Sequence, residues 1–130
     1  AIRRVHEWTT FAVNTPGQHA MAYAFTQLPS YLPDFRKLYE SKRDLLYSSL
    51  VDSKFTPHKP LGSYFMMVDV PEEFSDDMDC AMRLVKEFGV TTIPPSVFYL
   101  RSSEGKTMLR LCFAKSNETL RAGVECLRNV

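Results

Sequence analysis

Eight prolines divide this chain into short segments, and this division restricts it to short helices and strands joined by fixed turns. Proline lacks a backbone N–H and fixes φ, so it favours turns, edge strands and the first turn of a helix. Between the prolines, some segments have the spacing of apolar residues typical of a helix, whereas others alternate as a strand does. We therefore expect an α+β layer in which helices cover a small sheet.

The first part of the chain has helical periodicity. An opening helix is followed by a second one, in which Thr15 is placed to cap and Pro16 to occupy the first helical position. Pro29 is expected to end this second helix. The longest helical segment then opens at Pro33 and runs to about Ser49. Its apolar stripe and mixed charged face predict a helix that is solvated on one side.

The second part of the chain mixes strands with helices. Residues 55–62 hold two prolines and predict an extended loop or a short edge strand. Three aromatic or β-branched runs predict strands, at residues 64–70, 97–100 and 108–113, with a polar turn at 102–106. Ser75 is expected to cap a helix that ends at Gly89, and Ser116 or Asn117 to cap the last helix.

Charge and cysteine content exclude several classes of protein. The 16 Lys and Arg residues balance the 15 Asp and Glu residues, for a net charge of +1. We therefore expect no nucleic-acid partner and no anionic membrane surface, both of which favour a basic excess. With 45% apolar residues the chain is not a disordered tail. Three widely spaced cysteines form no CxxC pair, which predicts buried thiols in a reducing, cytoplasmic compartment.

The common catalytic motifs are missing from the sequence. Its five glycines are isolated, so no phosphate-binding loop is expected. Its three histidines lack metal-ligand spacing, and no serine lies in a GxSxG context. We therefore assign no catalytic, cofactor-binding or metal-binding residue within these 130 residues.

Arg110 is the one charged residue that the pattern makes unusual. Alternation in the run LRLCF at residues 109–113 places Leu109, Leu111 and Phe113 on one face, and Arg110 with Cys112 on the other. An arginine on a largely apolar strand can bind a carboxylate through its planar fork. The alternative is an edge-strand arginine whose stem covers apolar surface. Spacing alone leaves both interpretations open.

Several motifs, taken in order, resemble the C-terminal third of class I, fold-type I aminotransferases, and especially the kynurenine and methionine aminotransferase branch. The matching runs are VHE at residues 5–7, TFAVNTPGQ at 10–18, PLGSYF at 60–65, FGVTTIPPSVFY at 88–99, LRLCFAK at 109–115 and ETL at 118–120. These enzymes depend on pyridoxal 5′-phosphate (PLP), act as homodimers, and transfer an amino group from an amino acid to a 2-oxo acid. The resemblance implies the same fold, cofactor, substrates and homodimer for the complete protein.

The resemblance also implies roles for individual residues. Arg110 matches the arginine that binds the α-carboxylate of the substrate in this family. Phe11 matches an aromatic residue that reaches toward the partner's substrate side chain, although a packed aromatic at a helix end is the alternative. Ala12 stands where human-type relatives have a histidine, so methionine and other apolar or aromatic amino acids remain open beside kynurenine.

The resemblance places the Schiff-base lysine, the partner of the pyridine nitrogen and most phosphate ligands upstream of residue 1. Ser41-Lys42 is no substitute, because it lies on the charged face of the long helix. We therefore expect these residues alone to be inactive, with 1–30 ending the large domain, 31–52 forming the inter-domain helix and 53–130 forming the small C-terminal domain. Two alternatives remain: a PLP-dependent C–S lyase of the same fold, and a non-catalytic module that binds a carboxylate or a protein.

Overall fold

The computed structural model describes residues 1–130, which form two compact units, Ala1–Arg36 and Lys37–Val130. The first unit holds α1 (Ile2–Thr10) and the beginning of α2 (Thr15–Leu50). No residue of α1 is buried, and large apolar side chains such as Trp8 and Phe25 are exposed. Exposed apolar side chains that gather on a surface are typical of an interaction site. None of the helices has the combination of length and apolar character that a membrane span requires.

Helix α2 corrects the prediction of two separate helices. It runs through Pro29 and Pro33 without an end at either residue. Each proline removes one N–H, so a 36-residue helix loses few of its backbone bonds and the flanking turns continue. The cap also differs from the prediction, because the side chain of Asn14, and not that of Thr15, accepts a hydrogen bond from the Gly17 N–H at 2.7 Å.

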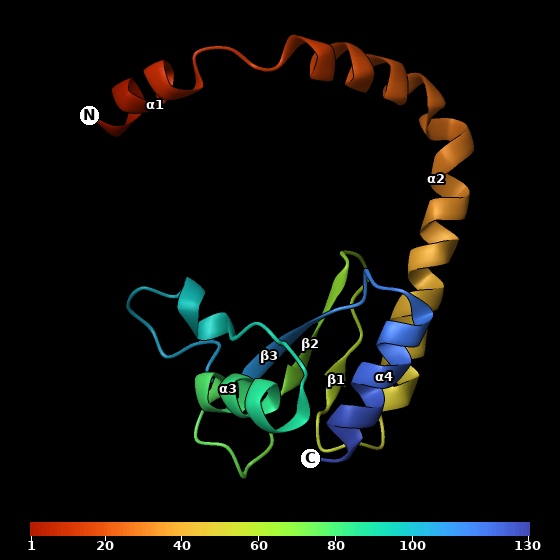
Figure 1. Cartoon of the computed structure of the whole chain (residues 1–130), viewed down its shortest axis with the longest axis vertical. Coiled ribbons are helices and arrows are strands. Elements are labelled where there is room, and N and C mark those ends of the chain that lie inside the picture. Colours follow the sequence, from red (N-terminus) through yellow and green to blue (C-terminus); the bar gives the residue numbers. More distant parts are fainter. The chain divides into compact units, whose positions relative to one another are not determined.

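The second unit contains a three-stranded antiparallel sheet in the order β1-β2-β3 (Figure 1). Its strands are β1 (Pro57–His58), β2 (Phe65–Asp69) and β3 (Met108–Cys112). Of the extended loop or edge strand expected at residues 55–62, a two-residue edge strand forms, and two of the three other predicted strands are confirmed. In the register of β2 with β3, Met67 lies opposite Arg110 and Phe65 opposite Cys112.

The third strand predicted, at residues 97–100, is wrong. This region forms the short 3₁₀ helix η1 (Pro95–Phe98), and Val97, Phe98 and Leu100 are exposed. Pro95 has a fixed φ suited to a helical first turn, and the Asp77 carboxylate accepts a hydrogen bond from the Ser96 N–H at 2.8 Å. The extended residue that pairs with β3 is instead Ile93, through an isolated antiparallel bridge to Arg110.

Two further helices, α3 (Asp77–Phe88) and α4 (Asn117–Arg128), complete the second unit. The cap of α3 is Asp76, whose side chain accepts from the Asp79 N–H at 2.9 Å, so the prediction of Ser75 is wrong by one residue. Gly89 ends α3 at φ 70°, as predicted, in the left-handed region that glycine tolerates. Ser116 caps α4 as predicted.

The core lies between the sheet and the helices that cover one of its faces. The sheet contributes its alternate residues Met66, Val68, Leu109 and Leu111, all of which are buried. The end of α2, together with α3 and α4, supplies the opposing side chains of the same cluster, among them Leu46, Leu50, Cys80, Leu84, Leu120, Val124 and Leu127. This two-layer arrangement is the predicted α+β layer of helices on a small sheet.

Polar contacts hold the C-terminal residues against the end of α2. Arg128 Nε donates to the Ser49 carbonyl at 3.0 Å, and Lys54 Nζ donates to the Val130 carbonyl at 2.8 Å. Lys54 also pairs with Glu73 at 2.6 Å. These exposed bonds add little energy individually, but they connect segments that are distant in the sequence.

Candidate functional site

The open face of the sheet, which is the face opposite the core, carries Arg110. Strand β3 alternates as predicted, with Leu109 and Leu111 buried in the core while Arg110 and Cys112 are half-buried on the other side. The same alternation in β2 places Phe65, Met67 and Asp69 on this open face. Arg110 therefore lies among largely apolar neighbours, where a guanidinium group is a distinctive binding group.

The backbone of Arg110 is hydrogen-bonded on both sides of its strand. One side pairs with β2, where Met67 is its partner. On the other side, Arg110 N–H donates to the Ile93 carbonyl at 2.9 Å and Ile93 N–H donates to the Arg110 carbonyl at 3.1 Å. Although β3 is the last strand of the sheet, Arg110 is therefore paired on both sides, which argues against an unpaired edge position. Pairing on two sides also fixes the origin of its side chain.

The guanidinium of Arg110 has unused hydrogen-bonding capacity. Its central carbon lies 4.5 Å from the centroid of the Phe65 ring, a cation–π contact. Its Nε is buried and has no hydrogen-bond partner in the chain. The two Nη groups are not buried and make no hydrogen bond within the chain, so they are the donors that an anion could reach. A carboxylate would match the fork in a bidentate manner.

Two residues of this site were not identified from the sequence. The Phe65 ring makes the cation–π contact with the guanidinium, and Ile93 forms the backbone bridge on the side of β3 away from β2. The alternation of residues 64–70 indicates that Phe65 shares a face with Met67, but it does not give the register with β3. Ile93 follows a glycine-ended helix and precedes two prolines, and nothing in that pattern distinguishes a bridge from a loop.

Phe11, the other predicted substrate-binding residue, belongs to the first unit, and Arg110 belongs to the second. Phe11 is 86% exposed. It follows α1 with φ 49°, and its N–H donates to the Glu7 carbonyl at 3.1 Å. A positive φ is unfavourable for a residue with a Cβ, so this backbone is strained. The role of Phe11 toward a partner's substrate remains a prediction.

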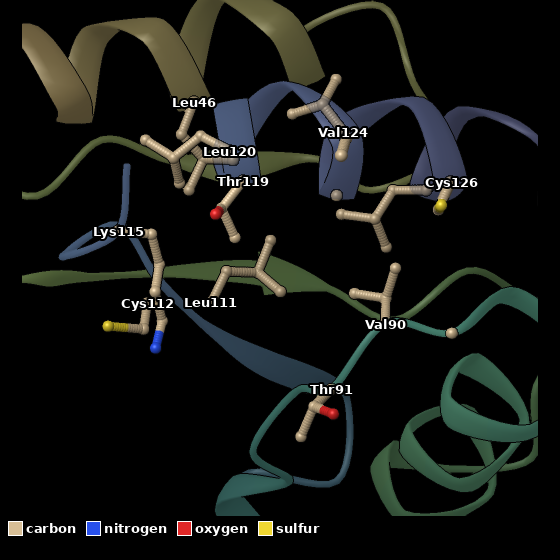
Figure 2. Close-up of a pocket in the computed structure, with 14 residues that line it drawn as sticks. Leu46, Val90, Thr91, Leu111, Cys112, Lys115, Thr119, Leu120, Val124 and Cys126 are labelled. Carbon is tan, nitrogen blue, oxygen red and sulfur yellow. The ribbon is translucent and has the colours of Figure 1, made fainter. Parts of the chain in front are cut away.

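A cavity of about 370 Å³ lies elsewhere in the second unit, between α4, the end of β3 and the turn after α3. Thr119 and Val124 of α4 face Leu111 and Val90 across it (Figure 2). Its lining is largely apolar and does not include Arg110. Lys115 is the one charged residue in its lining, and the planar guanidinium of Arg110 lies outside it, so the cavity is separate from the candidate anion site.

The three cysteines are all free thiols, as predicted. Cys80 is fully buried in α3, and this burial raises the pKa of its thiol to about 12. Cys112 and Cys126 are only half-buried, in disagreement with the expectation that all three are buried.

Comparisons with known proteins identify the family to which the chain is similar. Residues 1–127 match the family described as aminotransferase class I and II. The chain is 41% identical to the methionine aminotransferase of Escherichia coli over 133 residues, which cover 99% of this chain and 33% of that protein. It is 33% identical to the kynurenine–oxoglutarate transaminase of Dictyostelium discoideum, covering 92% of this chain and 32% of that protein.

Solved structures agree with the sequence comparisons. The crystal structure of an E. coli methionine aminotransferase superposes with a TM-score of 0.81 at 38% identity, covering 99% of this chain and 34% of that chain. The N-succinyldiaminopimelate aminotransferase of Mycobacterium tuberculosis gives a TM-score of 0.86 at 25% identity, covering 98% and 34%. The chain thus spans about a third of the length of these relatives. Its fold is that of part of a fold-type I aminotransferase, and the chain belongs to the class I and II aminotransferase family.

Proposed function

We propose that the complete protein is an aminotransferase that moves an amino group from an amino acid to a 2-oxo acid. The observation that carries this proposal is the unpaired guanidinium of Arg110 on the open face of the sheet. Amino acids and 2-oxo acids share one feature, an α-carboxylate. A single bidentate arginine can therefore hold both substrates of the reaction while their side chains differ.

The side chains beside Arg110 include no lysine that could hold PLP. The open-face positions of β2 and β3 beside Arg110 hold Phe65, Met67, Asp69, Met108 and Cys112. None of them has an amine that could form a Schiff base with the cofactor aldehyde. When bound, PLP supplies the electron sink for amino-group transfer. In our proposal its lysine, its pyridine-nitrogen partner and its phosphate ligands lie outside these 130 residues, whereas this chain binds and orients the substrate carboxylate.

We propose that the chain comprises parts of two domains. Residues 1–30 end the large domain, 31–52 form the inter-domain helix, and 53–130 form the small domain. The exposed apolar side chains of α1 support a buried interface for the first part. We also propose a homodimer in the cytoplasm, in which Phe11 contacts the substrate side chain in the partner's site. The exposure and strained backbone of Phe11 support this role.

The proposed amino donors are methionine and aromatic or kynurenine-like amino acids. Two relatives are named as methionine and kynurenine transaminases, which supports this range. The neighbours of Arg110 on the open face, Phe65, Met67 and Cys112, are apolar and polarisable. Thioether and aromatic side chains make favourable contacts with such groups.

The test uses the full-length protein purified with PLP. We expect methionine and a 2-oxo acid to be converted into the oxo acid of methionine and a new amino acid, in a ping-pong pattern. Product analysis identifies the alternatives. Ammonia, a thiol and an oxo acid that has lost the sulfur would indicate a C–S lyase, and carboxylate binding without turnover would indicate a binding module.

A further inference from the structure

Asp77, the first residue of α3, has a carboxylate that helix capping does not explain. The capping is done by the neighbouring Asp76, which accepts from the Asp79 N–H. Asp77 is completely buried, and its Oδ1 has no hydrogen-bond partner. A buried carboxylate that is only partly satisfied costs stability. Its presence at this position calls for another role.

The contacts of Asp77 join three segments that are distant in the sequence. Its Oδ2 accepts from the Ser96 N–H at 2.8 Å, and its own N–H donates to the Lys106 carbonyl at 2.8 Å. Gly105 is packed directly on the same segment, because a Cβ there would lie 3.0 Å from the Ser96 nitrogen. Asp77 therefore holds η1 between the start of α3 and the turn that leads into β3.

The segment held by Asp77 is the one that pairs with Arg110. Ser96 lies three residues after Ile93, and the intervening Pro94 and Pro95 leave little conformational freedom between the two. Ile93 makes two backbone hydrogen bonds with Arg110, at 2.9 and 3.1 Å. Fixing Ser96 thus fixes Ile93, and Ile93 fixes the strand position from which the Arg110 side chain starts.

We propose that Asp77 is a positioning residue for substrate binding, which holds the Ile93–Ser96 segment against β3 and thereby orients Arg110. This inference rests on the proposed aminotransferase function. The carboxylate acts as a hydrogen-bond acceptor for the Ser96 backbone and does not touch the substrate. Misplacing a binding group by a fraction of its contact distance weakens recognition of the α-carboxylate common to both substrates.

The experiment compares Asp77→Ala, Asp77→Ser and Asp77→Asn with the wild type in the full-length, PLP-loaded protein. Asp76→Ala is the matched control, because it removes the cap of the same helix without touching Ser96. We expect Asp77→Ala and Asp77→Ser to raise KM for both the amino acid and the 2-oxo acid about tenfold, with kcat changed less than about twofold. Asp77→Asn keeps an acceptor for Ser96 and should restore KM close to the wild-type value. Asp76→Ala should leave KM unchanged.

Amide hydrogen exchange provides a readout that does not need activity. If Asp77 anchors the segment, Asp77→Ala speeds exchange at the Ile93 and Arg110 amides, and Asp76→Ala does not. Asp77→Ser serves the same purpose where the alanine variant does not fold. The proposal would be overturned if Asp77→Ala and Asp77→Ser left both KM and the exchange rates unchanged. It would also be overturned if Asp76→Ala raised KM as much as these two variants do. A wild-type protein without turnover would refute the aminotransferase function, and exchange would still decide whether Asp77 holds the strand of Arg110.

Discussion

Replacement of Arg110 is the most direct test of the substrate site. We expect Arg110→Ala in the complete protein to remove two charge-assisted hydrogen bonds to the substrate carboxylate. At about 1.5–3 kcal/mol for each bond, the loss is about 3–6 kcal/mol. Since about 1.4 kcal/mol corresponds to a tenfold change, kcat/KM should fall by about two to four powers of ten. Arg110→Lys keeps the charge but loses the planar fork, so kcat/KM should fall by about one to two powers of ten.

The assay is the kinetics of each half-reaction, measured separately with the amino acid and with the 2-oxo acid. The structure predicts equal losses in both, because one guanidinium binds the group that both substrates share. Arg83→Ala is the control: Arg83 also lies over a phenylalanine ring, at 4.7 Å from Phe74, but it is exposed and paired with Glu87. It should leave both half-reactions unchanged.

The thermal stability of Arg110→Ala provides a second check. The Arg110 guanidinium makes no hydrogen bond or ion pair within the chain, so its removal leaves no protein group without its partner. We therefore expect the variant to remain folded. A variant with wild-type kcat/KM in both half-reactions, or with a loss in only one of them, would refute the role of Arg110.

Three further predictions concern stability and thiol chemistry. Leu84→Ala, at a fully buried position, should lower the free energy of unfolding by about 2–5 kcal/mol in urea titrations, whereas Leu61→Ala, at a fully exposed one, should change it by less than about 0.5 kcal/mol. Gly89→Ala places a Cβ at φ 70° and should destabilise the folded protein by about 1 kcal/mol. Gly123→Ala, within α4 and with open space around it, should stabilise the folded protein by a similar amount. Equal shifts in melting temperature for the two variants would contradict this. With a pKa of about 12, Cys80 is about one part in ten thousand thiolate at pH 8, so mass spectrometry should find it unlabelled by iodoacetamide in native protein and labelled after unfolding.

Much of the local structure follows from the sequence because it depends on neighbouring residues. Gly89 ends α3 since a left-handed residue is needed there, and Ser116 caps α4 through its own hydroxyl. The alternation around Arg110 predicts its face correctly, because side chains in a strand alternate whatever the partner strand is. Motif order likewise indicates the family that the comparisons show.

Where the sequence fails, contacts between distant segments decide the outcome. Residues 97–100 have strand-forming side chains, yet the Asp77 carboxylate, 19 residues away, binds Ser96 and favours η1. The prolines of α2 are tolerated because turns on both sides of them continue, which a local rule about proline does not take into account.

The sequence by itself determined that an arginine lies on an apolar strand, that it shares a face with Cys112, and which family the order of motifs resembles. Only the tertiary structure decided that the Arg110 backbone is bonded to β2 on one side and to Ile93 on the other, that its guanidinium lies over the Phe65 ring, and that its Nε has no hydrogen-bond partner in the chain. The reason is physical: alternation is a property of one strand, whereas register, pairing and hydrogen-bond satisfaction depend on which segments meet.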